Sequence, residues 1–290
     1  MYKTDDFTYG MEIEWGDVPR TIAIPNYFGQ WEYSERDIIN LVEPYKNVCA
    51  DPLGIEPKFG GEINTTPTRT WHEQVVRYFQ LEDYFKKLSY QPTVSATCHT
   101  HIHCRVPFLK DDIKSLKKLI GYIKENQHTA IQCAYGFHEL EEMSLVKGAK
   151  RYLKWDGGRP MPDYMCNNIM ELSHDFDSFI KLHAAGKDGV SMGRPFRYAI
   201  NTYCLKHLDT IEFRLFRGTL VQSQLESCFR FVHDFINAAL NDGDSVADLI
   251  LKNNYNFPPM IWSRSQLEGW KQTKYDDKRG KKVRTYVEVI

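Results

Sequence analysis

Long apolar runs and an excess of charge of one sign are both missing from this chain of 290 residues. Lysine and arginine together number 37 against 38 aspartates and glutamates, so the surface as a whole neither attracts nor repels nucleic acid strongly. No apolar run approaches the roughly 20 residues that cross a bilayer. The start, MYKTDDFTYGMEIEW, lacks the basic end and apolar stretch of a secretion signal. We therefore expect no nucleic-acid partner and no membrane attachment.

A paired set of cysteines is missing as well. Seven cysteines, an odd number without any CxxC motif, are more typical of reduced thiols in a cytosol than of a disulfide framework. With 42% hydrophobic residues, the chain can bury one large core, or one core and a modest second lobe. The composition predicts a cytoplasmic globular protein, either an enzyme or a binding domain.

Two hydrophobic periods alternate along the chain and predict a mixture of strands and helices. Strands are expected at 7–15, 60–66, 94–106, 197–205 and 210–217, the last two joined by a turn at 207–209. Helices are expected at 71–88 after a capping box of Thr70 and Glu73, near 111–131, near 174–184, and from a cap at Thr219 to about 241. The rest of 139–195 is rich in glycine and proline and predicts long loops.

The stretch SATCHTHIHCRV, residues 95–106, holds three histidines at every second position. With the two-residue period of a strand, His99, His101 and His103 share a wholly polar face, opposite a face of small and apolar residues. A solvent-exposed strand face explains this alternation. A row of histidines, however, favours metal or phosphate binding. Both interpretations stay open on this stretch alone.

Carboxylates recur at the same spacing in two other expected strands. Glu12 and Glu14 share one face and lie within about 7 Å, where like charges repel unless a cation lies between them. Glu62 and Asn64 share a face of the next strand. Each pair alone is weak evidence, because exposed glutamate pairs are common.

Arginines accompany a third acidic strand. The segment TIEFRLFRGTL places Glu212 and Arg214 on one face, and Arg217 continues the basic character. Arg197 and Asn201 share a face of the neighbouring expected strand. Guanidinium groups suit phosphate oxygens and glutamates ligate Mg²⁺. The strands together predict a metal–nucleotide site on a sheet.

These motifs resemble, in order, those of the amidoligases, relatives of glutamine synthetase and glutamate–cysteine ligase. GMEIE is similar to the family's G-x-E-x-E strand, GGEINTTP to its second acidic strand, CHTHIHCRV to its H-V-H strand, and AINTYCLKHLDTIEFRLFRGTL to its asparagine strand followed by T-x-E-F-R. The resemblance spans residues 9 to about 220. His99 departs from it, because the family more often has glycine there.

The resemblance implies an α+β fold: a glutamine synthetase-like curved antiparallel sheet that forms a funnel-like active site and is packed by helices. Residues 1–241 would be the catalytic domain, and 242–290 an extension packed on it, whose basic segment 271–284 has no assigned role. The implied activity is ATP-dependent ligation of a carboxylate and an amine through an acyl phosphate. The substrates would be amino acids or peptides, and an oligomer is compatible with the family.

The resemblance also implies metal ligands. Carboxylate oxygens for two or more Mg²⁺ ions, with Mn²⁺ as an alternative, would come from Glu12, Glu14, Glu62 and Glu212. Mg²⁺ prefers oxygen, so only the resemblance to glutamine synthetase suggests His101 as a nitrogen ligand. His103 would contact an ATP phosphate or the second metal.

The remaining residues would handle substrates. Arg214 and Arg217 would stabilise charge on the transferred phosphoryl group, where electrostatics and positioning do most of the work. Asn201 and Arg197 would hold ATP or the substrate carboxylate. Asp51 would bind the incoming amine, or serve only as a turn residue.

Two other functions compete with the ligase. A zinc hydrolase can also use an H-x-H strand, but one zinc needs three protein ligands and His99 and His103 are roughly 13 Å apart on a straight strand. A catalytically inactive relative would act as a binding module. The intact acidic and arginine residues argue against that second alternative.

Overall fold

The structure is a computed structural model. It describes residues 6–15, 23–25, 31–33, 54–55, 61–65, 67–87, 94, 99–134, 160–185 and 198–258. Within these ranges, the side chains of 13–15, 23–25, 31–33, 54–55, 61–64, 81, 84–85 and 87 lie outside the description. The expected site residues Asp51 and Arg197 and the basic segment 271–284 lie outside the described residues.

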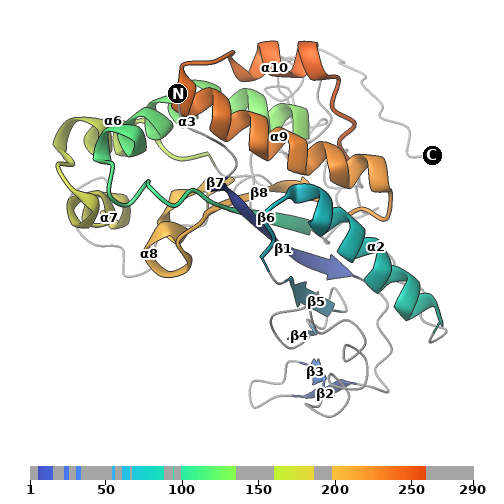
Figure 1. The fold of residues 1–290 in the computed structure, drawn as a ribbon. Helices are drawn as coiled ribbons and strands as arrows, with labels where there is room; N and C mark the ends of the chain where they lie inside the picture. Colours follow the sequence, from blue (N-terminus) through green and yellow to red (C-terminus); the bar gives the residue numbers. More distant parts are fainter. Residues whose placement is uncertain are drawn as a thin grey trace, which may run out of the picture.

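The described strands form one antiparallel sheet in the order β2-β3-β4-β5-β1-β6-β8-β7 (Figure 1). Their bounds are β1 Thr8–Trp15, β2 Ala23–Pro25, β3 Trp31–Tyr33, β4 Gly54–Ile55, β5 Gly61–Asn64, β6 His99–Arg105, β7 Ile200–Asn201 and β8 Ile211–Arg217. Segments far apart in the sequence are therefore neighbours in space, because β1 lies between β5 and β6, and β8 follows β6.

Several of the helices pack on one side of the central strands. The helices are α2 Trp71–Lys87, α3 Ile113–Ala134, α6 Asp163–Leu172, α7 Phe176–Ala184, the 3-10 helix η4 Thr202–Cys204, α8 Leu205–Leu208, α9 Gln222–Asn241 and α10 Val246–Asn253. In Figure 1, α9, α3 and α10 lie over the sheet and α2 runs beside them, while β4, β3 and β2 extend away from this layer. The mixture of helices and strands is an α+β fold.

The core lies between the sheet and these helices. Phe213 on β8 packs edge-on against Phe235 on α9, with ring centroids 5.4 Å apart. Phe216, near the end of the same strand, packs against Phe231. Each fully buried phenylalanine contributes about 2–3 kcal/mol of hydrophobic stabilisation. Because side chains alternate along a strand, burying Met11, Ile102 and Phe213 in the core directs their polar neighbours to the opposite face.

Most of the expected elements are confirmed. β1, β5 and β6 occupy the expected positions, as do α2, α3 and α7. The Glu73 backbone N–H donates to Thr70 Oγ1 at the start of α2, as the capping pattern predicts.

Three expectations are wrong. Residues 163–172 form α6 rather than loop: this helix begins directly after Pro162 and buries Met165 and Ile169 at helical spacing, a signal hidden between glycine- and proline-rich segments. The expected strand 197–205 ends at Asn201, whose side chain accepts from the Tyr203 backbone N–H and starts η4. Two helices and the left-handed Asp209 thus replace the expected simple turn at 207–209.

The third wrong expectation is the cap of α9. This helix has Val221 as its N-cap, and Thr219 instead accepts a hydrogen bond from the Val221 backbone N–H. Thr219 therefore shapes the connection from β8 and does not cap the helix.

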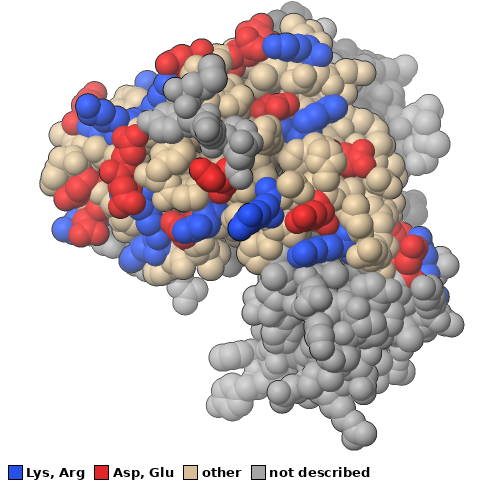
Figure 2. Space-filling view, in the orientation of Figure 1, with Lys and Arg blue, Asp and Glu red and all other residues tan. Residues whose placement is uncertain are grey.

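Two further features concern the molecule as a whole. Among the described residues, no helix is long and apolar enough to cross a membrane. On the described part of the face drawn in Figure 2, lysines and arginines are interspersed with aspartates and glutamates, and neither sign forms a continuous patch. This mixture matches the near-zero formal charge of −1.

Candidate active site

A β-bulge in β8 brings two arginines to the same face of the sheet. The pairing of β6 with β8 matches His103 with Glu212 and Ile102 with Phe213, then shifts, so that Thr100 pairs with Phe216. Two residues of β8, Arg214 and Leu215, therefore lie opposite one residue of β6, His101, which lies between Thr100 and Ile102. Beyond the bulge the alternation restarts in the other phase. Arg217 consequently joins the face of Arg214, although a spacing of three would separate them in a regular strand.

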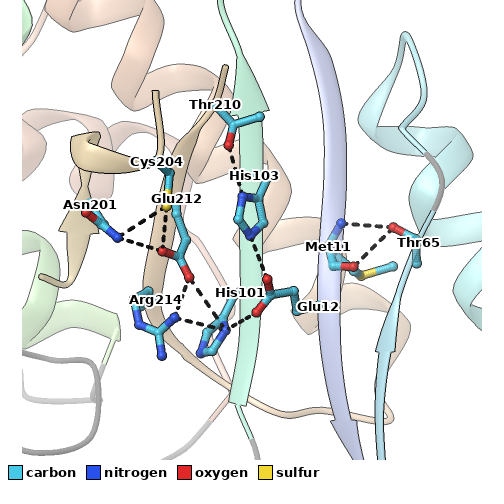
Figure 3. A network of polar contacts seen from close by, with 10 residues as sticks. All are labelled: Met11, Glu12, Thr65, His101, His103, Asn201, Cys204, Thr210, Glu212 and Arg214. Carbon is cyan, nitrogen blue, oxygen red and sulfur yellow. Dashed lines mark hydrogen bonds and ion pairs between the residues drawn. The ribbon is translucent and has the colours of Figure 1, made fainter. Parts of the chain in front are cut away.

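Glu12 lies between two histidines of β6. Its Oε2 is 2.8 Å from His101 Nδ1, and its Oε1 is 3.2 Å from His103 Nε2 (Figure 3). The antiparallel register of β1 and β6 pairs Glu12 directly with His101. The two histidines thus contact one carboxylate through different ring nitrogens.

Glu212 has partners on both carboxylate oxygens. Asn201 Nδ2 donates to its Oε2 at 2.8 Å, and the Cys204 thiol donates to the same oxygen at 3.1 Å. Arg214, two residues further along β8, donates to Oε1 (Figure 3). The turn from β7 into η4 places Asn201 and Cys204 beside Glu212, so the part of the expected strand that is wrong builds this half of the site.

The environment keeps both glutamates ionised. Burial alone would raise the pKa of Glu12, but hydrogen bonds from His101 and His103, and the charge that these rings carry when protonated, hold that pKa well below its ordinary value. Burial likewise raises and Arg214 lowers the pKa of Glu212, with the two histidines adding to the lowering, and the net shift is downward. Burial and the neighbouring Glu212 raise the pKa of the Cys204 thiol, so it stays a protonated hydrogen-bond donor.

Glu12, His103 and Glu212 form a group that can hold a divalent cation. Each offers one ligand atom, and these atoms lie within 4.8 Å of one another. Adjacent ligands of an ion bound at 2.0–2.1 Å lie about 3 Å apart, so the 3.2 Å between Glu12 and His103 already suits shared coordination. Two carboxylates with an imidazole fit Mg²⁺ less well than Mn²⁺ or Zn²⁺ on ligand type alone.

His101 lies next to this group but contributes differently. Its Nδ1 is engaged by Glu12, 3.4 Å from Arg214 and 3.8 Å from Glu212 Oε1. The expectation that His101 is a ligand therefore depends on its other nitrogen, Nε2. His103 is the histidine that the geometry groups with the two glutamates.

His99 and Arg217 form a basic pair on the same face of the sheet, beyond His101 and Arg214. Arg217 Nη1 is 3.0 Å from His99 Nε2, and the two residues pair across β6 and β8. Arg217 is buried, with 2% of its surface exposed. The His99 and His101 rings stack with centroids 6.1 Å apart. His99, which the sequence left without a role, orients an arginine.

The other expected acidic residues are placed only by their backbone. The β1–β5 register pairs Glu14 with Glu62 and Glu12 with Asn64, so all four positions lie along the same two strands. This register is compatible with the expected acidic row. Their roles as metal ligands stay a prediction.

The sequence matches no protein-family model and no curated protein. The evidence for function therefore consists of the site itself.

Two contributors were missed from the sequence. Thr210 precedes Glu212 by two residues, so strand alternation could have placed it on the site face, and its Oγ1 lies 3.1 Å from His103 Nδ1. Cys204 had no such signal, because it reaches Glu212 only through η4, which replaced an expected strand.

Proposed function

We propose that the protein is an ATP-dependent carboxylate–amine ligase. The observation that carries this proposal is the arrangement of charge on one face of the sheet. A cation-binding group of Glu12, His103 and Glu212 adjoins two buried arginines, Arg214 and Arg217, which the bulge turns to the same side. Guanidinium groups beside a carboxylate-rich metal site are suited to bind a polyphosphate that is also held by Mg²⁺ or Mn²⁺.

Arg214 has a donor that a ligand could use. Its Nε is buried and has no hydrogen-bond partner among the described residues, whereas its Nη1 donates to Glu212 and lies 3.4 Å from His101 Nδ1. A buried donor without an acceptor costs about 1–3 kcal/mol. An anionic oxygen of a phosphate or carboxylate would satisfy it, which supports a binding site for anions.

The proposed reaction has two steps. An oxygen of the substrate carboxylate attacks the γ-phosphorus of ATP, the bond to ADP breaks, and an acyl phosphate forms. The nitrogen of an amine then attacks the acyl carbon, inorganic phosphate leaves, and the nitrogen loses a proton to give an amide or isopeptide. Such phosphoryl transfer depends mainly on positioning and charge stabilisation.

The side chains divide this work by charge. Glu12, His103 and Glu212 would hold the divalent cation, which when bound neutralises phosphate charge. Arg214 and Arg217 would stabilise charge on the transferred group, and Asn201 keeps Glu212 oriented. The remaining residues keep the roles that the family resemblance implies: Glu14, Glu62, Arg197, Asp51 and His101.

The direct test is an ATP-hydrolysis screen with Mg²⁺ against pools of carboxylates and amines, with products identified by mass spectrometry. Hydroxylamine in place of the amine should trap the acyl phosphate as a hydroxamate. Phosphate release that requires a carboxylate supports the ligase. No ATP turnover with any pool would argue for a binding module.

The substitution Glu212→Gln tests the assignment of the site. It removes a negative ligand but keeps the shape and the bond from Asn201. Loss of a group that merely orients a metal ligand costs about 10–100-fold, so we expect the loss of acyl-phosphate formation here to be at least as large. Glu171→Gln, at an exposed position on α6, is the matched control and should retain activity. Wild-type turnover in Glu212→Gln would refute the metal assignment.

A zinc-dependent hydrolase is the second candidate, because three ligands with an open position also describe a catalytic zinc site. The two arginines and the orphaned donor of Arg214 favour the ligase over this alternative. Metal analysis of protein purified without chelator separates them. Stoichiometric zinc together with hydrolysis that needs no ATP would favour the hydrolase.

A further inference from the structure

His103 is held at both ring nitrogens. Its Nδ1 lies 3.1 Å from Thr210 Oγ1 and its Nε2 lies 3.2 Å from Glu12 Oε1 (Figure 3). The residue is only 9% exposed. The ring cannot turn without losing both partners, so its orientation is defined before any ligand binds.

The two contacts constrain where the protons lie. An ionised Glu12 only accepts hydrogen bonds, so Nε2 of a neutral His103 carries the proton and Nδ1 must accept from the Thr210 hydroxyl. Binding a cation through Nε2 requires the reverse tautomer, with the proton on Nδ1. Thr210 must then accept. A hydroxyl both donates and accepts and can rotate between the two roles, which neither a carboxylate nor an ammonium group can do.

We propose that Thr210 is a positioning residue whose hydroxyl reverses from donor to acceptor, so that His103 exchanges its bond to Glu12 for a divalent cation shared with Glu12 and Glu212. The reversal lets the ring change tautomer without losing its Nδ1 partner. This inference rests on the cation site that the proposed function requires, and not on the ligase chemistry.

The turn before β8 holds the hydroxyl in place. Asp209 has left-handed backbone dihedral angles, with φ of 59°. Its Oδ2 accepts from Arg105 Nε at 2.6 Å, and its Oδ1 is 3.1 Å from Lys110 Nζ. Arg105 follows His103 by two residues on β6, so the pairs His103–Thr210 and Arg105–Asp209 fasten the end of β6 to this turn at two successive positions.

The tautomer of His103 can be read directly by nitrogen NMR of histidine-labelled full-length protein at neutral pH. Without a divalent ion we expect the Nε2–H form, and with saturating Mg²⁺ the Nδ1–H form. An unchanged tautomer on adding Mg²⁺, or a doubly protonated ring without the ion, would overturn the reversal.

The cation affinity gives a second readout that needs neither ATP nor substrate. Mn²⁺ titration followed by electron paramagnetic resonance should show Thr210→Val binding about 10–100-fold more weakly than the wild type, as is typical when a partner of a metal-bound histidine is lost. Thr210→Ser keeps the hydroxyl and should retain most of the affinity. Equal Mn²⁺ affinities for the valine variant and the wild type would refute the role of Thr210.

The outcomes separate this inference from the proposed function. A wild-type protein that binds no Mn²⁺ and no Mg²⁺ would overturn the cation site and this inference together. Normal cation binding with an unaffected Thr210→Val would overturn only the inference. If the valine variant does not fold, the wild-type tautomers still decide the question.

Discussion

Every carboxylate oxygen of Glu12 and Glu212 has a partner within the described network. The partners of Glu12 are histidines, whereas Glu212 contacts Arg214, Asn201 and Cys204. Such buried networks act as a unit, because a low dielectric strengthens each bond and penalises any group left alone. Single substitutions here should therefore affect binding and stability together, and comparisons between neighbouring residues are more informative than single losses.

The two histidines beside Glu12 provide such a comparison. His103→Ala removes a member of the proposed cation-binding group and should lower Mn²⁺ affinity by more than about 100-fold, since even an orienting partner is worth about 10–100-fold. His101→Ala removes the bond to Glu12 Oε2 but no member of the Glu12, His103 and Glu212 group, and should cost less. Mn²⁺ titration of both variants checks the order. A larger loss in His101→Ala would mean that His101 is itself a ligand, as the family resemblance implies.

At the scale of elements, two irregularities build the site. The bulge in β8 aligns Arg217 with Arg214, and the end of β7 at Asn201 lets η4 bring Cys204 to Glu212. Helix α7 packs against η4, because His183 Nε2 on α7 contacts Thr202 Oγ1 on η4 at 3.0 Å. Aromatic rings of Phe179, Tyr198 and Tyr203 surround His183.

This buried histidine should make folding sensitive to pH. Burial lowers the pKa of His183 from 6.5 to about 4, so between these values the unfolded chain binds a proton that the folded chain does not. The free energy of unfolding should therefore fall by about 3 kcal/mol as pH falls through this window. In His183→Gln, which keeps a donor near Thr202 but does not titrate, urea unfolding should show a loss smaller by that amount. Parallel pH dependences of the two proteins would contradict the prediction.

At the scale of the molecule, the last described helix belongs to the same core as the sheet. Val246 at the start of α10 is fully buried, and its backbone N–H donates to Asn126 Oδ1 on α3 at 2.9 Å. Lys118, also on α3, donates to the last turn of α9 at Leu240 O. The segment joining α9 to α10 is thus tied to α3 at both ends.

One cooperative unfolding transition is therefore expected. Val246→Ala should lower its free energy of unfolding by about 2 kcal/mol, because the substitution leaves a cavity between α10 and α3. Leu251→Ala on the same helix is the matched control: Leu251 is 84% exposed, so the change should stay within about 0.5 kcal/mol. Urea denaturation measures both. An unchanged main transition in Val246→Ala would show that α10 unfolds separately.

The sequence by itself determined which residues could share a face. Strand alternation placed Glu12, the three histidines of β6, and Glu212 with Arg214 correctly, because the period of two follows from local backbone geometry. Helical periodicity likewise located α2 and α3. These features depend on interactions within a few residues of each other.

Only the tertiary structure decided how those faces meet. The bulge that turns Arg217 into the site and the pairing of His103, rather than His101, with Glu212 depend on β6, which pairs with β1 on one side and with β8 on the other. The early end of β7 depends on the Asn201 side chain, which starts η4. Register between strands far apart in the sequence is set by packing of the core face, where Phe213 and Phe216 must both reach α9. With two core residues three positions apart, one strand residue has to be left over. That extra residue moves the second arginine onto the face of the first.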